Sequence, residues 1–410
     1  LQATASFTSN ANRGITLGAG GGQIYASSGT FSVAGIVEGA GSLTTYGNLS
    51  LSGINTYSGG TSVRWGTLQT GATAALGTGA ATIGANSGST ASLDLNGQTI
   101  ANALTLYGNG DGAAGALINS SATSATYAGL ITLGSASSIV GGTGSIAVTN
   151  ADSIAGSGFG LTLGGTVGGS LTSPLATGAG TLTKEGVGTW TLAGANTYTG
   201  ATTISGGTLQ IGGTAGHLGS GASYAGAISV ASGSVLQFSS PVAQTLSGVI
   251  SGLGSVALSG SAATLTLSGS NSFTGGTVVG AGTLALGASD ALADGGGVTV
   301  SGTGTLSLGA YSDTVASVSL QGTGSITSST GVLTSTGAYD LQAGTASAIL
   351  AGSAGVNKIT AGTVTLSGAN TYTGGTSINA GTLKVGSDSA LGASAVTVGS
   401  SSSSVASLDL

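Results

Sequence analysis

The sequence predicts an all-β protein in which the chain winds as a single parallel β-helix, or solenoid. Three observations favour this class: a motif that recurs four times, apolar residues that alternate with polar ones in short runs, and 82 glycines among 410 residues. Recurrence at a fixed spacing indicates stacked repeats, alternation indicates strands with one buried face, and glycine suits frequent corners. No long window shows the 3.6-residue apolar period of a helix.

The repeat sets the length of one coil. Its four copies share an Asn-x-Tyr/Phe core and a later Gly-Thr-Leu strand start, and they occupy Leu51–Thr70, Leu192–Ile211, Leu267–Leu286 and Leu366–Val385. In each copy the second strand begins 19 positions after the first, as Gly381 follows Gly362. A constant step of this size is typical of one solenoid coil, so the chain should form roughly 20 coils of about 19–22 residues.

The strands of each coil should have one face in the lumen. In Thr363–Leu366, valine and leucine alternate with threonine, so Val364 and Leu366 should point inward. Leu383 should lie against Val364 in the next coil, with Lys384 facing solvent. The lumen would then be filled by every second residue of short extended segments.

Corners and further strands complete each module. The stretch Asn370–Thr376 is predicted to form a turn, because glycine and asparagine tolerate positive φ. Modules begin near residues 51, 192, 267 and 366, and we expect one continuous β-helical domain over residues 1–410. Leu1 does not open a signal peptide and Leu410 falls within a module, so we expect this chain to be a fragment of a longer protein.

Composition excludes several classes of partner. The formal net charge is -6, and the five basic residues are scattered rather than clustered. Nucleic acid and anionic membrane surfaces are therefore poor partners. No apolar run reaches the roughly 18 residues of a membrane-spanning helix, and the lack of cysteine excludes disulfides and thiolate metal sites.

The segment from Gly180 to Gly212, GTLTKEGVGTWTLAGANTYTGATTISGGTLQIG, resembles the passenger-associated strand repeat of bacterial autotransporters. The later copies LTLSGSNSFTGGTVVGAGTLALG and VTLSGANTYTGGTSINAGTLKVG follow the same pattern. The resemblance implies a secreted, right-handed parallel β-helix on a Gram-negative cell surface. Such passengers are usually followed by a membrane translocator, which this chain does not include.

Residues that could carry chemistry are few. His217 is the sole histidine, so it cannot form a catalytic triad or a histidine metal cluster with others, and a turn position explains it better. Asp290 and Asp294 flank Ala-Leu-Ala and are expected as exposed turn residues. Asp94 and Asp409 lie between leucines, which places them on the outer face. A carboxylate pair for sugar cleavage on adjacent coils is the remaining alternative.

Aromatic residues favour packing over recognition. The ring that follows the repeat asparagine alternates between tyrosine and phenylalanine, which indicates a packing role: Tyr57, Tyr198, Phe273 and Tyr372. Trp65 and Trp190 occur once each, with ligand stacking as the weaker alternative to packing.

The sequence therefore predicts a structural or adhesive segment of a secreted, cell-surface autotransporter-like protein: a stalk, an adhesin or a component of extracellular fibres. A polysaccharide-binding or ice-binding β-helix is the alternative, and a polysaccharide-degrading enzyme is the weakest hypothesis. Thr-x-Thr pairs suggest the ice-binding version, but their copies stand several coils apart: Thr181–Thr183, Thr264–Thr266 and Thr363–Thr365.

No enzyme activity is expected, and no catalytic, cofactor-binding or metal-binding residue is assigned. We expect no cofactor. The expected partners are copies of the chain itself, host or other surfaces, or polysaccharide, with no nucleic acid and no membrane insertion by this segment. The expected location is extracellular or on the bacterial cell surface.

Overall fold

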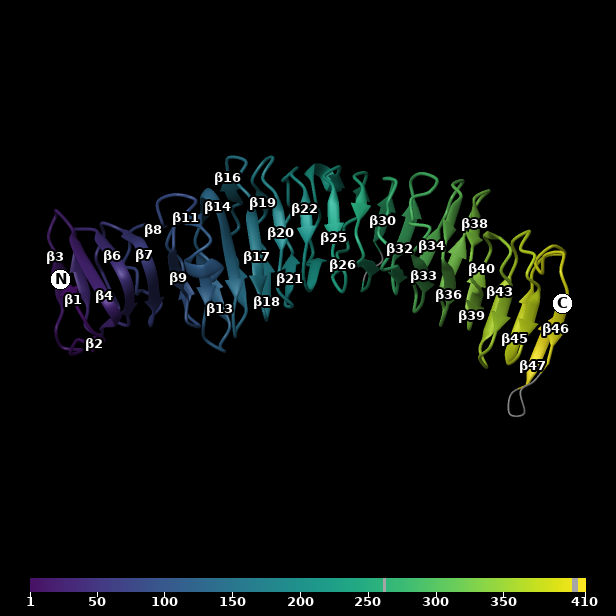
Figure 1. The fold of residues 1–410 in the computed structure, drawn as a ribbon, viewed down its shortest axis with the longest axis horizontal. Coiled ribbons are helices and arrows are strands. Elements are labelled where there is room, and N and C mark those ends of the chain that lie inside the picture. The colour runs from purple at the N-terminus through teal and green to yellow at the C-terminus, as the bar shows by residue number, and fades with distance from the viewer. Residues whose placement is uncertain (261–262, 400–404) are drawn as a thin grey trace. The chain divides into compact units, whose positions relative to one another are not determined.

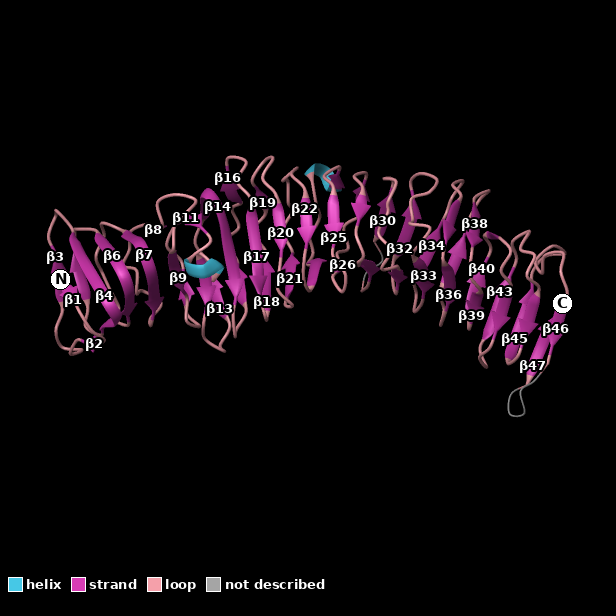
Figure 2. Ribbon diagram, in the orientation of Figure 1, coloured by secondary structure: helices cyan, strands magenta, loops and turns pink. Residues whose placement is uncertain are grey.

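The computed structural model describes residues 1–260, 263–399 and 405–410, and the chain divides into two compact units, Leu1–Leu209 and Gln210–Leu410. Both units consist almost entirely of strands and loops (Figure 2). The chain forms a β-solenoid of about 19 turns, shared between the two units. This confirms the predicted all-β, parallel solenoid class. That the whole chain is one continuous domain stays a prediction.

Unit 1 is built from short strands that lie side by side in chain order (Figure 1). They are β1 (Gln2–Ala3), β2 (Phe7–Thr8), β3 (Ile15–Leu17), β4 (Gly22–Val33), β5 (Val37–Gly39), β6 (Leu43–Leu51), β7 (Thr61–Thr70), β8 (Ala81–Ile83), β9 (Ala91–Asp94), β10 (Thr99–Ile100), β11 (Leu104–Gly108), β12 (Leu117–Asn119), β13 (Ala125–Tyr127), β14 (Ile131–Gly141), β15 (Ile146–Val148), β16 (Ile154–Gly156), β17 (Leu161–Gly165), β18 (Gly168–Leu171), β19 (Leu175–Ala176), β20 (Leu182–Lys184), β21 (Thr189–Leu192) and β22 (Thr202–Ile204). A 3-10 turn, η1, spans Asp111–Ala113.

Strand β23 (Thr208–Ile211) includes the point of division. Unit 2 continues with the 3-10 turn η2 (Ser220–Ala222) and the strands β24 (Ser223–Tyr224), β25 (Ile228–Val230), β26 (Val235–Phe238), β27 (Gln244–Leu246), β28 (Ile250–Ser251), β29 (Ser255–Leu258), β30 (Thr264–Leu267), β31 (Thr277–Val279), β32 (Thr283–Leu286), β33 (Gly297–Val300), β34 (Thr305–Ser307), β35 (Asp313–Val315), β36 (Ser317–Leu320), β37 (Ser325–Thr327), β38 (Val332–Ser335), β39 (Tyr339–Leu341), β40 (Gly344–Ala346), β41 (Ile349–Ala351), β42 (Val356–Lys358), β43 (Thr363–Leu366), β44 (Thr376–Ile378), β45 (Gly381–Val385), β46 (Val396–Val398) and β47 (Ala406–Asp409).

Each strand pairs in parallel with the equivalent strand of the next coil. In unit 2, β30 pairs with β32, β32 with β34 and β34 with β37. In these ladders Leu284 lies 19 residues after Leu265, Leu306 lies 22 after Leu284, and Ile326 lies 20 after Leu306. These steps agree with the predicted coil length.

Coil length varies more in unit 1. Leu43 pairs with Thr61, 18 residues on, whereas Leu104 pairs with Ile131, 27 residues on. The longer coil includes the turn η1 and its glycine-rich loop between β11 and β12. Insertions of this kind are accommodated at corners, here with a local register shift in the β11–β14 ladder between Leu106 and Gly108.

The lumen is the core of both units. The predicted contact is present: Val364 pairs with Leu383, and both side chains are fully buried. Lys384 is exposed, as expected, and Val385 is half-buried. Each such aliphatic side chain contributes about 1.5–3 kcal/mol through burial, and the contribution is shared between neighbouring coils.

A glycine is required at the corner before the second repeat strand. Gly381 has a φ of 71°, and a Cβ there would lie 2.3 Å from the carbonyl oxygen of Thr360 in the preceding coil. Gly207, its counterpart in the second copy, has a φ of 62°. L-residues rarely adopt this backbone conformation, and the neighbouring coil also leaves no room for a side chain.

Because coils interact mainly with their neighbours, one whole coil should be removable. Deletion of residues 306–325 would bring Ile326 into the position of Leu306, opposite Leu284, and keep every inward residue inward. We expect this variant to retain its β-type circular dichroism and a cooperative thermal transition.

The matched control is deletion of residues 306–315, which removes about half a coil and misplaces the following strands. This control should lose its cooperative transition. If both deletions unfold to the same extent, or both are tolerated, the coil is not the structural unit.

Candidate functional site

The repeat asparagines are structural bridges between coils. Asn55, Asn196, Asn271 and Asn370 are buried at corresponding corners. Each Oδ1 accepts the backbone N–H of a residue one coil earlier, at 2.8 Å from Val37, 2.9 Å from Leu175, 2.7 Å from Ile250 and 2.8 Å from Leu350. Three of the Nδ2 groups donate forward to a carbonyl at 2.6 Å, on Ala75, Ala291 and Ala390. One amide therefore links three successive coils.

The ring two residues later packs inside the corner. Tyr57, Tyr198, Phe273 and Tyr372 are all buried, as the packing hypothesis predicted. The three tyrosine hydroxyls also pair with a threonine hydroxyl four residues on, for example Tyr57 with Thr61 at 2.5 Å. This hydrogen bond was not predicted, because the phenylalanine of the third copy suggested a purely apolar slot. Burial raises the pKa of Tyr57 to about 12.

The carboxylate of Asp313 makes the same contact to the preceding coil as the amides of the repeat asparagines. Its Oδ2 accepts the N–H of Leu292, one coil earlier, at 2.9 Å. The carboxyl is buried, and Oδ1 has no hydrogen-bond partner among the described residues. Burial raises the pKa of Asp313 from 3.8 to about 6; hydrogen bonds from Leu292 and Ala291 oppose the rise, and the charge of Asp290 adds to it.

Two lysines point into the lumen, which sequence reasoning missed. Lys184 is fully buried, and its Nζ donates to the carbonyls of Glu185, Gly186 and Gly206 at 2.9, 2.8 and 2.8 Å. Lys358 is fully buried too, and its Nζ donates to the carbonyls of Thr360 and Ala380. Burial lowers the pKa of Lys184 to about 8, while Glu185 raises it. Both lysines stand 12 positions before a repeat asparagine, at an inward position of their strand.

The other candidate polar residues are dispersed. Asp290 and Asp294 are exposed, as expected, and Asp409 is exposed as well. Asp94 is 2% exposed, so the expectation of an accessible carboxylate there is wrong. Its oxygens accept hydrogen bonds from Gln69 Nε2, the N–H of Asn96, and both the N–H and Oγ of Ser120. The neighbouring corner covers Asp94, which the alternation of residues within its own strand cannot reveal.

Other single residues also have structural positions. His217 is half-buried at an isolated β-bridge position two residues after the turn Gly213–Ala215. Trp190 is buried, and its Nε1 donates to the carbonyl of Gly164 at 2.8 Å, in line with the packing expectation. The described residues contain no group of three His, Cys, Asp or Glu side chains placed to hold a metal ion. None of the helical segments in the described part of the chain has the length and hydropathy to span a membrane.

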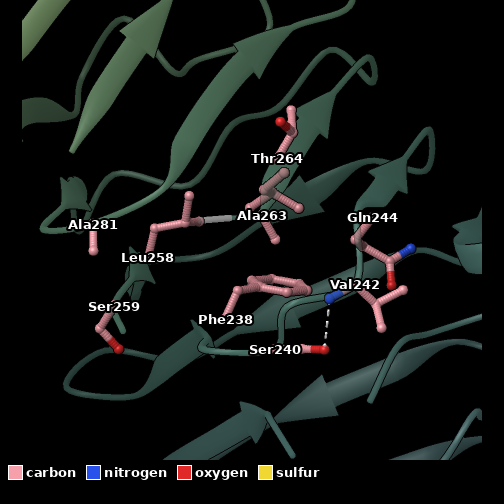
Figure 3. A pocket seen from close by; sticks show the side chains of 10 residues that line it. Phe238, Ser240, Val242, Gln244, Leu258, Ser259, Ala263, Thr264 and Ala281 are labelled. Carbon is pink, nitrogen blue, oxygen red and sulfur yellow. Dashed lines mark hydrogen bonds between the residues drawn. The ribbon is translucent and has the colours of Figure 1, made fainter. Parts of the chain in front are cut away.

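One pocket of unit 2 is small. The pocket in Figure 3 has a volume of about 20 Å³ and is lined by Phe238, Leu258, Ala263 and neighbouring side chains. Ser240 closes one side by accepting the N–H of Val242. A space of this size holds about one water molecule. This pocket therefore has no room for a larger ligand.

One outer face of unit 2 carries a continuous file of hydroxyl groups. Strand pairing aligns outward residues of six successive strands, β30, β32, β34, β37, β40 and β43: Thr264, Thr283, Thr305, Ser325, Thr345 and Thr365. The intervening coils thus carry threonine or serine in this one file. Thr266, the second threonine of the pair Thr264–Thr266, lies opposite Ala285, so complete Thr-x-Thr pairs stay several coils apart, as the sequence indicated. The file ends at Lys384, which lies opposite Asp409.

One outer face of unit 1 carries three aromatic rings. Tyr25 of β4, Tyr46 of β6 and Trp65 of β7 are aligned by strand pairing on successive coils. The ring centroids of Tyr25 and Tyr46 are 5.7 Å apart, and Trp65 lies edge-on to Tyr25 at 5.7 Å. Trp65 is 38% exposed and Tyr25 40% exposed, so the packing expected of Trp65 leaves much of its ring open to solvent. We call these three residues the aromatic cluster.

A β-bulge directs Trp65 outward. Thr45 pairs with Val63 but Tyr46 pairs with Trp65, so β7 has one extra residue, Arg64, at this point. Val63 is buried, whereas Arg64 and Trp65 are both exposed. Without the extra residue, alternation would turn Trp65 toward the lumen. Bulges often re-aim a side chain in this way.

The sequence profile of the passenger-associated transport repeat matches residues 46–69, 182–211, 261–286 and 357–385. The chain carries four copies of this repeat. They coincide with the four copies found by inspection, and the resemblance to the autotransporter passenger repeat is confirmed. No curated protein and no solved structure matches the chain.

These repeats and the β-solenoid fit a segment of an autotransporter passenger. Passenger repeats of this family are generally structural, and the family implies a secreted or cell-surface location. Each matched segment includes a repeat asparagine and the glycine before the second strand.

Replacement of Asp313 by Asn should place a neutral amide at this corner, as in the four repeat corners. Because the folded-state pKa of Asp313 lies above its unfolded value, the folded state binds this proton more tightly. Its stabilising effect is complete below about pH 3.8 and is lost as pH rises through about 6. Asp313→Asn should therefore raise the free energy of unfolding at pH 7.5 by about 1–3 kcal/mol, the range for a buried polar atom that regains a partner.

The measurement is the thermal midpoint of both proteins between pH 4 and 8. The two midpoints should converge near pH 4. Asp294→Asn, at an exposed carboxylate, is the control and should show little difference at any pH. If the difference in thermal midpoint between the two proteins does not change with pH, titration of the Asp313 carboxyl is not its cause.

Proposed function

We propose that the chain is a structural and adhesive segment of a secreted, cell-surface autotransporter-like protein. The observation that carries this proposal is the coincidence of the four passenger-associated transport repeats with the corners of a solenoid. In such a fold the polar groups of each corner serve to join coils. A stalk, an adhesin or a fibre component needs this kind of extended, self-supporting scaffold.

The distribution of polar groups supports a scaffold over a catalyst. Buried ionisable and amide side chains such as Lys184, Asp94 and Asn370 are hydrogen-bonded to backbone groups of neighbouring coils. The exposed carboxylates Asp290 and Asp294 lie in turns, and neither belongs to a group of three His, Cys, Asp or Glu side chains among the described residues. What distinguishes the outer faces is their files of hydroxyl and aromatic side chains, which suit contact with extended surfaces.

Surface display can be tested in intact cells. The full reading frame that contains this chain would be expressed in a Gram-negative host with a protease site inserted in the exposed loop 85–88. We expect protease added outside intact cells to cleave at this site, and displaying cells to adhere or aggregate more than cells that lack the chain.

The control is the unmodified loop, which should stay uncut under the same conditions. Cleavage that occurs only after lysis would contradict surface display. Display without any gain in adhesion or aggregation would leave a stalk but contradict the adhesive part of the proposal.

An ice-binding surface is the second candidate, favoured by the hydroxyl file on six successive strands of unit 2. Successive strands are about 4.8 Å apart, so the file presents hydroxyls at a regular spacing that could order water. Thermal hysteresis of the purified chain tests this candidate. Thr305→Lys, in the middle of the file, should abolish hysteresis, whereas Thr203→Lys, on an exposed position of β22, should not. Absence of hysteresis in the unmodified chain excludes it.

A further inference from the structure

The aromatic cluster of unit 1 lies beside a second, polar file on the same face. Gln23 pairs with Thr44, and Thr44 with Ser62, each two or three residues before a member of the aromatic cluster. Ile24, Thr45 and Val63, which lie between the two files, are buried in the lumen. The face therefore presents exposed rings along one line and hydrogen-bonding side chains along the next.

A cation completes this face. Arg64 is exposed at the bulge and makes no hydrogen bond or ion pair with the described residues. Its situation differs from that of the buried Lys184 and Lys358, whose ammonium groups are held by carbonyls. A free guanidinium offers a planar fork of donors that matches a carboxylate.

We propose that the aromatic cluster, with Arg64 and the polar file, binds an acidic polysaccharide that contains uronate units. The apolar C–H face of a pyranose ring packs on the face of an aromatic ring, and its hydroxyls need the hydrogen-bonding partners that Gln23, Thr44 and Ser62 supply. Arg64 pairs with the uronate carboxylate. This site would give the adhesive segment proposed above a specific ligand. It rests on that proposed function, because only a chain displayed outside the cell would meet the polysaccharide.

The geometry favours a linear polysaccharide over a peptide. The three strands that carry the rings span about two strand spacings, about 10 Å. The rings lean together above them, with the centroids of Tyr25 and Trp65 5.7 Å apart, so the aromatic cluster is a compact platform of a size that suits one sugar ring, and the polar file beside it can contact the next. The strands beneath are already paired on both sides: β6 lies between β4 and β7, and β7 has β6 on one side and β8 and β9 on the other. Only Arg64 and Trp65 fall between the ladders to β8 and β9, so no continuous strand edge is present there to accept a peptide by strand addition.

Trp65 reports on the site directly, because the chain has only two tryptophans and Trp190 is fully buried. The purified 410-residue chain would be titrated with polygalacturonate oligomers while tryptophan emission and heat of binding are recorded. We expect saturable binding with a change in emission. Trp65→Ala and Tyr25→Ala should each weaken binding about tenfold or more, the effect typical of a central aromatic contact.

Specificity for the acid is tested with a second ligand and a second variant. Arg64→Gln should reduce affinity for polygalacturonate to the level of its fully methyl-esterified form, and should leave the affinity for the ester unchanged. Trp65→Tyr should retain most of the binding. Tyr311→Ala, at a 40% exposed tyrosine of unit 2, is the matched control and should bind like the unmodified chain.

Several outcomes would overturn the proposal. These are no binding by the unmodified chain, binding insensitive to both aromatic substitutions, equal affinity for acid and ester, or tighter binding of polyglutamate than of polygalacturonate. Circular dichroism of each variant establishes that it is folded. Because the assay uses purified protein, its failure leaves the intact-cell protease test of surface display unaffected.

Discussion

The corner amide that bridges three coils is the interaction on which the rest of the structure depends. A strand ladder satisfies its own N–H and C=O groups, but a corner interrupts the ladder and leaves buried backbone groups without partners. An asparagine such as Asn370 supplies one acceptor to the coil before and one donor to the coil after. Loss of the side chain would orphan both, at a cost of about 1–3 kcal/mol for each buried group.

The same corners show what happens when the group carries charge. Asp313 can accept a hydrogen bond as asparagine does, but in its ionised form it cannot donate one, and its second oxygen lacks a partner among the described residues. The buried lysines supply donors where acceptors gather. The Nζ of Lys184 donates hydrogen bonds to three backbone carbonyls that converge in the lumen. Buried charge in this fold follows the hydrogen-bonding needs of the backbone at each corner.

The strands, their inward residues and the corner glycines could be predicted from sequence because each follows from a local rule. Alternation determines that Val364 and Leu383 face the lumen, and the 19-residue step determines that they meet. Lys184 and Asp94 could not be predicted, since their burial depends on carbonyls and corners contributed by neighbouring coils. Trp65 depends on a bulge of one residue, and the hydroxyl file emerged only once strand pairing placed single threonines of different coils in register.

The burial of two lysines has a consequence for the lifetime of the chain outside a cell. Proteases of the trypsin type must bind an accessible Lys or Arg side chain, and the 410 residues contain five. Lys184 and Lys358 are sealed within the lumen, so only Arg13, Arg64 and Lys384 offer their side chains to such an enzyme. The long stretch from Trp65 to Leu383 thus presents no site for this class of digestion while it is folded, a durability that comes from where the charges are placed.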